Sequence, residues 1–485
     1  MNLDSMVENN YSEIVNNIEK VLKLYEKRTL SLIGKITVIK AMAIPKLVYV
    51  MSVLPKPNPA MIKRLETMFR RFIWGTGKPR LSLRDLEKDI SGGGLKLPNI
   101  DNLNNALKLC WIKRVIDKTG AWQSNFETLV GAEKSKVWDL DLSSLMHLSS
   151  SMTNPFWKEV LCAWHKYKSC FIHHIDVRTY PIWNTVFMVN QNLISLRPEF
   201  QSKGVNYIND LLDESGNLMG YLSFKKKFNI DLNFVDFYSL THAIPRSWKN
   251  ALFENSIKLN ANLVYQKVLT DLLAMEKVCR GTYWTLINMN TSERKINEKW
   301  GLCLNKTIEA SSFNAYYSIP FTCTIEAKLR SFQYKILQRI LPTKKFLKLC
   351  NITNDDLCSY CHKEVETIEH LFWRCHCVKI FWNQIASSLL PYIDLSFALN
   401  ESCILLGTIC ESNKHLINHV ILLCKRYIYI NKFVSDKLSI SAVLNIIRNV
   451  YEIEKNIVIR KALNSQKLDH KWDPIKILFN VNSFV

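Results

Sequence analysis

The chain has 485 residues, of which 48% are hydrophobic and 22% are charged. This composition is ordinary for a globular protein, so it excludes whole-chain disorder and a collagen-like structure. Only 14 glycines and 14 prolines are present, which argues against an all-β chain with frequent tight turns. The sequence therefore predicts a mainly α-helical protein, and its length suggests about three domains.

The charge balance points to a polyanionic partner. Lysine and arginine outnumber aspartate and glutamate, which gives a formal net charge of +21. A net positive charge of that size favours binding to RNA, to DNA or to an anionic membrane surface. No apolar run reaches the length of about 18 residues that a membrane-spanning helix needs, so we expect no membrane span.

The cysteines bear on both compartment and metal binding. Residues Met1–Ser5 show neither the basic nor the apolar region of a signal peptide, so we expect a cytoplasmic or nuclear protein that is not secreted. Thiols stay reduced in those compartments. Clusters among the 14 cysteines therefore indicate metal ligands more than disulfides.

Residues 1–120 are predicted to form a basic helical region. The segment Ser31–Ala43 has apolar residues at helical spacing, and Pro45 is expected to break or kink that helix. A second helix is predicted over Pro59–Trp74, with its proline at the first helical position.

The helix Pro59–Trp74 has two contrasting faces. The apolar face carries Met61, Leu65, Met68, Phe69 and Phe72. The opposite face carries Lys63, Arg64, Arg70 and Arg71. Because Glu66 is the one acid of this helix, two interpretations stay equally open: a solvated charged face, or a set of phosphate contacts.

A glycine turn and another helix complete this region. Gly92–Gly94 is predicted as a sharp turn or a site of close backbone packing, and it lacks the phosphate-loop pattern. Asp101 is expected to cap the next helix. The predicted apolar stripe of that helix is Leu103, Leu107, Cys110 and Trp111. Lys108, Lys113 and Arg114 are expected elsewhere on its surface.

Residues 121–320 are predicted to form a helical connecting region with one or two short hairpins that the sequence does not locate. Aromatic residues are frequent, and we expect most of them in the core. They include Trp122, Trp138, Phe156, Trp157, Trp164 and Trp183.

A cysteine and histidine pattern carries the clearest chemical signal. Cys358 and Cys361 are separated by two residues, which lets both thiolates reach one ion. His370 and Cys375 are five apart on a predicted helix turn and should lie on one side of it. Three sulfurs and one nitrogen form a closed shell suited to a structural Zn²⁺. His362, His376 and Cys377 are rivals for single positions, and Cys377 in place of Cys375 is the main alternative.

A basic segment comes directly before this pattern, with a helix predicted over Ile325–Leu341. The segment Leu329–Cys350 holds six cations and no acid: Arg330, Lys335, Arg339, Lys344, Lys345 and Lys348. The first five are predicted to contact phosphates, and the aromatic residues Phe372 and Trp373 to stack on bases. The alternative is a helix that packs one apolar face and leaves the other in water, and both interpretations can hold together.

Several segments resemble reverse transcriptases of LINE-type non-LTR retrotransposons. The zinc-binding region of that family is similar to Leu329–Thr343, Cys358–Cys361, Glu366–Cys375 and Phe381-Trp382. The segment after the polymerase palm is similar to Ser31–Lys35, Pro45-Lys46, Tyr49, Phe72–Trp74 and Gly93–Pro98. The C-terminal region is similar to Ala243–Trp248, Glu452–Lys455 and Lys471-Trp472.

The resemblance implies an organisation in three parts. They are a thumb-like region at 1–120, a helical connecting region at 121–320 and a zinc-binding C-terminal domain at 321–485. The family's endonuclease and its palm, with paired aspartates that hold two metal ions, are not expected here. The adjacent pair Asp355-Asp356 lacks the family's preceding aromatic residue and is read as a loop or cap.

The leading hypothesis is therefore a C-terminal part that grips template RNA and target DNA. It is expected to lack polymerase activity alone and to associate with the missing polymerase portion. The alternative is a zinc-scaffolded protein-interaction module, in which the positive charge only maintains solubility. An independent enzyme is a third hypothesis, which no Ser/His/Asp order, phosphate loop or HExxH pattern supports.

Overall fold

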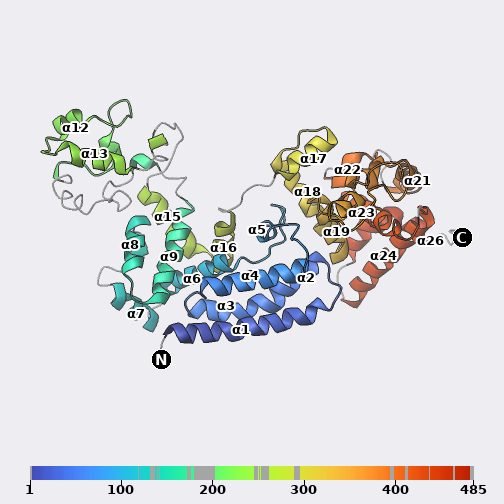
Figure 1. Cartoon of the computed structure of the whole chain (residues 1–485), viewed down its shortest axis with the longest axis horizontal. Helices are drawn as coiled ribbons and strands as arrows, with labels where there is room; N and C mark the ends of the chain where they lie inside the picture. Colours follow the sequence, from blue (N-terminus) through green and yellow to red (C-terminus); the bar gives the residue numbers. More distant parts are fainter. Residues whose placement is uncertain are drawn as a thin grey trace. The chain divides into compact units, whose positions relative to one another are not determined.

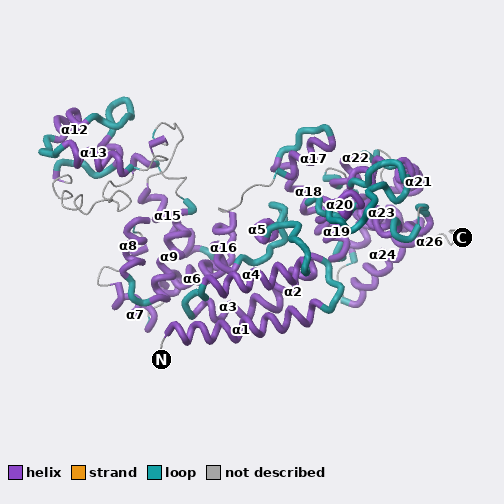
Figure 2. Tube along the Cα trace, viewed as in Figure 1, coloured by secondary structure: helices purple, strands orange, loops and turns teal. Residues whose placement is uncertain are grey.

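The computed structural model describes residues 3–117, 120–130, 137–138, 140, 142–171, 176–179, 202–244, 249–250, 252, 261–288, 295–393, 398–409, 413–435, 437–461 and 465–480. Figure 2 shows helices joined by loops throughout these ranges. The strand pairing in the described residues is limited to two isolated bridges, Leu212–Leu218 and Leu357–Val365. The prediction of a mainly α fold is confirmed, and strand pairing in the described part of residues 121–320 is limited to the antiparallel bridge Leu212–Leu218.

The chain forms two compact units. The first comprises Met1–Ile18, Ile44–Leu65 and Pro98–Thr291, and the second Glu19–Ala43, Glu66–Leu97 and Ser292–Val485. Both units are assembled from segments that alternate along the chain. The three domains expected at 1–120, 121–320 and 321–485 stay a prediction. They are continuous ranges of residues, whereas the two units are defined by contacts in space.

Figure 1 labels the helices of both units. The long helices α1 (Leu3–Glu26) and α4 (Pro59–Trp74) contribute residues to each unit. The first unit also contains α3 (Ile44–Val53), α6 (Ile100–Asp117), α7 (Ala121–Val130), α8 (Leu142–Ser151), α9 (Pro155–Ser169), η4 (Val177–Thr179), η6 (Ile208–Leu211), α12 (Tyr221–Phe228), α13 (Phe234–Ala243), α15 (Ala261–Ala274) and α16 (Val278–Asn288). The second also contains α2 (Leu32–Val38), η1 (Ile39–Ala43), α5 (Leu83–Glu87), α17 (Ile296–Leu304), α18 (Ala310–Cys323), α19 (Ala327–Leu337), α20 (Lys344–Leu349), η7 (His370–Arg374), α21 (His376–Ile393), α22 (Glu401–Leu406), α23 (Lys414–Asn431), α24 (Ile440–Arg460), α25 (Gln466–Trp472), η8 (Asp473–Ile475) and α26 (Lys476–Asn480).

Helix α6 lies at the centre of the first unit, where it packs against α3, α9 and α16. It begins one residue before Asp101, and the side chain of Asn99 accepts the hydrogen bond from the amide of Asn102. The predicted cap at Asp101 is therefore wrong. Lys108 is buried, not exposed, because neighbouring helices enclose α6. Its ammonium donates to the carbonyl of Met51, 2.7 Å away, and so satisfies the end of α3.

The aromatic residues of the first unit mostly form its core, as predicted. The buried ones among those named from sequence are Trp138, Phe156, Trp157 and Trp164. Trp122 differs, since 55% of it is exposed while its ring packs edge-on against Trp111. Trp183 lies outside the described residues.

The helix predicted over Ser31–Ala43 continues beyond Pro45 into α3. Ser31 caps α2 by accepting the hydrogen bond from the amide of Gly34. The π-helical segment η1 precedes Pro45, which lacks an amide hydrogen and clashes with the carbonyl of an α-helical turn. The proline therefore lies within a continuous helical stretch, and Leu32–Val53 is long and apolar enough to cross a membrane by length and composition. This stretch qualifies although the sequence has no uninterrupted apolar run of that length; its most apolar 18-residue window is 39% buried, and a core helix passes the same test.

Helix α4 has the bounds that the sequence predicts. Met61, Leu65, Phe69 and Phe72 are buried, and Met68 is half-buried. The four cations of the opposite face are exposed: Lys63, Arg64, Arg70 and Arg71. The geometry thus separates the apolar and basic faces as expected.

The glycine turn at residues 92–94 packs against α19 in the second unit. Gly93 has a left-handed φ of 77°. Its carbonyl accepts hydrogen bonds from the hydroxyl of Tyr334 at 2.9 Å and the amide of Gln338 at 2.7 Å. A Cβ on Gly94 would overlap the carbonyl of Lys88. Both predicted properties, the sharp turn and the close backbone approach, are confirmed.

Candidate metal centre

A tight backbone turn presents the first two candidate ligands. The amide of Cys358 donates to the carbonyl of Glu364 at 2.8 Å, and the amide of His362 donates to the carbonyl of Cys358 at 3.0 Å. His362 closes the turn in a left-handed conformation with φ 53°. The fold therefore holds Cys358 and Cys361 at the two ends of one knuckle, as their spacing predicts.

A π-helical turn presents the other two candidate ligands. The amide of Cys375 donates to the carbonyl of His370 at 3.0 Å, which is a five-residue hydrogen bond. This wider turn returns the chain to the same side after five residues and not after the usual three or four. His370 and Cys375 consequently face one point, although a regular α-helix would have rotated them apart.

The two turns bring all four ligand atoms within 4.8 Å of one another. The sulfurs of Cys358 and Cys375 are 4.0 Å apart, and the Cys361 sulfur lies 3.3 Å from Nε2 of His370. A tetrahedral ion with zinc–sulfur bonds of about 2.3 Å needs sulfurs about 3.8 Å apart. The hydrogen bond between these two thiols lowers the pKa of Cys358 and raises the pKa of Cys375, so Cys358 is the easier of the two to deprotonate when no ion is bound. The donor set therefore fits one Zn²⁺ in a closed, structural shell.

Carboxylates outside the four ligands hold the site in place. Nδ1 of His370 lies 3.0 Å from a carboxylate oxygen of Glu364, so Nε2 is the nitrogen that faces the cysteines. Glu366 is fully buried and accepts a hydrogen bond from the hydroxyl of Ser359, inside the knuckle, at 3.1 Å. The ammonium of Lys432, on the residue after α23, pairs with Glu366 at 2.6 Å. This pair ties the knuckle to α23.

We expect Glu364→Gln to weaken zinc binding about tenfold, because a carboxylate beside a ligating histidine orients its ring and raises its basicity. Competition with a chromophoric chelator measures this affinity. Glu452→Gln is the control, since Glu452 is an exposed carboxylate on α24. Equal affinities for both variants would show that Glu364 does not orient His370.

The structure distinguishes among the rival ligands. Cys375 is fully buried and belongs to the group of four. Cys377 belongs instead to a smaller group with Cys375 and His376. Its sulfur lies 3.6 Å from the carbonyl of Tyr360 and 3.3 Å from Nε2 of His376. His362 is exposed and belongs to neither group.

The aromatic residues beside the site do not fit the predicted stacking role. Phe372 is fully buried and packs edge-on against Phe332 at 6.0 Å, so the expectation that it stacks on bases is wrong. Its apolar ring fills the core beneath η7, and its carbonyl accepts a hydrogen bond from Trp382. Trp373 is half-buried.

The pair Asp355-Asp356 lies in the loop before the knuckle. Asp355 accepts a hydrogen bond from the amide of Leu357 and pairs with Lys344 at 3.0 Å. Asp356 pairs with Lys348 at 2.9 Å. The interpretation of these aspartates as loop residues is confirmed.

The five predicted phosphate contacts of the basic segment have different environments. Arg330 donates to the carbonyls of Thr324 and Phe321, and Arg339 pairs with Glu369 and lies over the ring of Trp300. Lys344 pairs with an aspartate, as described above. Lys335 is half-buried and Lys345 is exposed. Three of the five side chains therefore have partners within the chain. Contact between any of the five and nucleic acid stays a prediction.

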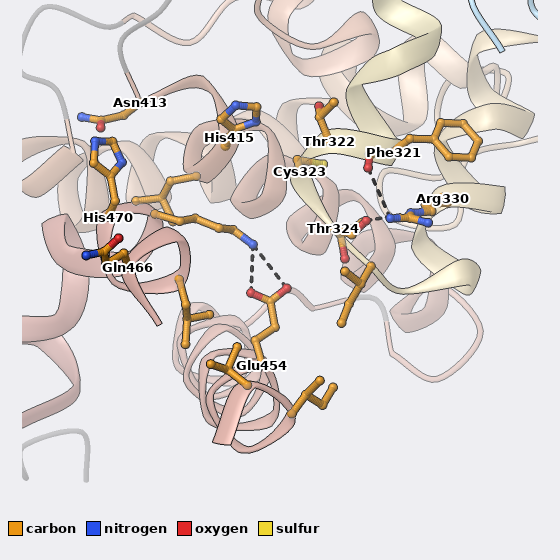
Figure 3. A pocket seen from close by; sticks show the side chains of 16 residues that line it. Phe321, Thr322, Cys323, Thr324, Arg330, Asn413, His415, Glu454, Gln466 and His470 are labelled. Atoms are coloured by element: carbon orange, nitrogen blue, oxygen red, sulfur yellow. Dashed lines mark hydrogen bonds and ion pairs between the residues drawn. The ribbon is translucent and has the colours of Figure 1, made fainter. Parts of the chain in front are cut away.

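A separate cavity of about 980 Å³ opens in the second unit, between the end of α18 and helices α24 and α25 (Figure 3). Inside it, the ammonium of Lys471 pairs with Glu454 at 2.9 Å. Burial raises the pKa of Cys323 to about 11, so its thiol is protonated at neutral pH. The cavity therefore presents no activated cysteine.

The four converging ligand residues, the π-turn and the basic segment belong to one helical module that could hold a metal ion. Residues 294–382 match the family model described as zinc-binding in reverse transcriptase. This match spans α17 to the first turns of α21 and contains all four candidate ligands. The chain is therefore related to reverse transcriptases through this segment.

Proposed function

We propose that this chain is the nucleic-acid-binding, C-terminal part of a LINE-type non-LTR retrotransposon reverse transcriptase. The observation that carries the proposal is that the matched segment contains the four residues whose ligand atoms converge. The zinc ion would hold the knuckle and the π-turn together. It would supply folding free energy and no catalytic step.

The surface of α4 supports a role in binding RNA or DNA. Its buried apolar face fixes the helix, and its four cations face solvent. Arg70 and Arg71 have no ion pair within the described residues. Exposed cations on a rigid helix in a chain of net charge +21 suit a phosphate backbone.

The proposal also covers activity, partners and location. The chain would bind nucleic acid without polymerase activity alone, would act together with a polymerase portion and would reside in the cytoplasm or nucleus. A template–primer extension assay with the purified chain is expected to give no labelled product. Labelled product would overturn this part of the proposal.

Binding to a structured RNA, measured by fluorescence anisotropy across a salt series, tests the function. We expect affinity to fall steeply with salt, because phosphate contacts release counterions. The double variant Arg70→Gln/Arg71→Gln should reduce the log–log slope by roughly 1.5, at about 0.7–0.9 per contact. The control is Lys226→Gln/Lys227→Gln, which neutralises two exposed lysines on α12.

Flat or absent binding by the wild-type chain would contradict the proposal. It would favour the zinc-scaffolded protein-interaction module instead. If both double variants reduced the log–log slope equally, the net charge of the chain and not specific phosphate contacts of α4 would explain the salt dependence.

A further inference from the structure

Four cations converge on helix α19 in the second unit, and we call them the basic cluster: Lys35, Arg80, Lys335 and Arg426. They come from α2, the loop after α4, α19 and α23. All four are half-buried. Residues 35, 80 and 426 lie far from residue 335 in the sequence, so the fold alone assembles the cluster.

Contacts with α19 and with the residues just after it place the members of the basic cluster. The amide of Ile33 donates to the hydroxyl of Ser331 at 3.0 Å, which sets α2, and with it Lys35, against α19. The guanidinium of Arg426 lies 5.4 Å from the ring centroid of Phe332 on α19. The guanidinium of Arg80 donates to the carbonyl of Ile340 at 2.7 Å.

The basic cluster is not neutralised inside the chain. None of its members forms an ion pair in the part of the chain that the structure describes. Burial lowers the pKa of Lys335, and the three other members lower it further. Burial also lowers the pKa of Lys35, an effect that Glu26 opposes. Like charges held together at partial burial destabilise the fold unless an anion binds between them.

The donors that remain suit a phosphate group. The side chains of Lys335 and Arg426 have no hydrogen-bond partner among the described residues. Arginine presents paired N–H donors that match phosphate oxygens, and lysine adds a compact charge. The aromatic rings under Arg80 and Arg426, Phe346 and Phe332, hold the guanidinium planes in position.

We propose that the basic cluster is one anion site that takes a backbone phosphate group of a bound nucleic-acid strand. This inference rests on the proposed nucleic-acid binding and assigns to it a specific point of contact. The four residues of the basic cluster are different from the exposed cations of α4 and from the four candidate zinc ligands.

The first test compares Lys335→Gln and Arg426→Gln with Lys328→Gln in the full chain. Lys328 is an exposed lysine on the same helix and serves as the matched control. The probe is a single-stranded oligonucleotide, and anisotropy is measured across a salt series. Each cluster variant should bind roughly tenfold more weakly and reduce the slope by about 0.7, while the control changes affinity less than about twofold.

The second test separates binding from folding. Without added anion, Lys335→Gln should melt at a higher temperature than the wild-type chain, because it relieves like-charge repulsion. Inorganic phosphate should raise the melting temperature of the wild-type chain more than chloride at equal ionic strength, and the variant should lose this difference. A lower melting temperature for both cluster variants would show that these cations are structural, and would overturn the proposal.

The outcomes distinguish this proposal from the function on which it rests. Steep salt dependence in the wild-type chain, with cluster variants equal to Lys328→Gln, would refute the basic cluster alone. Absence of salt-dependent binding in the wild-type chain would refute the proposed function. Stabilisation by inorganic phosphate with unchanged oligonucleotide binding would identify a site for free phosphate and overturn the assignment to a backbone.

Discussion

Cys361→Ser is expected to release the zinc ion and to unfold the helical module of the second unit that contains the four candidate ligands. A structural zinc contributes binding free energy of about 10 kcal/mol or more to folding, and a hydroxyl does not replace a thiolate ligand. The module buries His370 and Cys375 within its core, so loss of the ion would also disrupt the packing of η7 against α21. Circular dichroism during thermal unfolding, together with elemental analysis, measures both effects.

Two cysteines provide controls for this variant. Cys350→Ser changes an exposed cysteine outside the ligand group and should leave zinc content and melting temperature unchanged. Cys377→Ser tests the remaining rival and should also retain the ion. If Cys361→Ser kept both its metal and its stability, the assignment of the site would be wrong.

Lys432→Met is expected to destabilise the second unit by about 3–5 kcal/mol, because it leaves the carboxylate of Glu366 buried without its cation. Glu366 would keep the hydrogen bonds from Ser359 and from the amide of Lys344, which do not neutralise its charge. The midpoint of urea unfolding, at saturating zinc, measures the change.

A double variant and an exposed lysine give the controls for the buried pair. Glu366→Gln/Lys432→Met removes both charges and should recover part of the lost stability. Lys379→Met changes an exposed lysine on α21 and should shift stability by less than about 0.5 kcal/mol. A loss below about 1 kcal/mol for Lys432→Met would show that Glu366 does not depend on Lys432 as its counter-ion.

Helix α4 and the four candidate ligands could be predicted from sequence, because both depend on residues that are close together in the chain. Helix α4 follows from apolar residues repeated at helical spacing and a proline at its start. The four converging ligands follow from a two-residue and a four-residue gap. The sequence did not predict the π-helical turn that lets His370 and Cys375 face one point, since spacing alone does not distinguish it from an α-helix.

Tertiary packing determined the features that sequence reasoning missed or assigned wrongly. Lys108 reads as a surface residue, yet surrounding helices bury it against the end of α3. Phe372 reads as an exposed ring beside a zinc site, yet it fills the core. Glu366 and its partner Lys432 are 66 residues apart, so no local signal connects them. The basic cluster likewise arises from four distant segments.

X-ray absorption at the zinc edge of the purified full chain tests most directly the claim that one structural zinc organises this module. The geometry predicts one zinc per chain with three sulfur ligands at about 2.3 Å and one nitrogen ligand at about 2.0 Å. It also predicts no oxygen ligand, because the shell of four protein ligands is closed. A chain purified without stoichiometric zinc, or a spectrum with two nitrogens or a water oxygen, would contradict the assignment of Cys358, Cys361, His370 and Cys375 as the ligands.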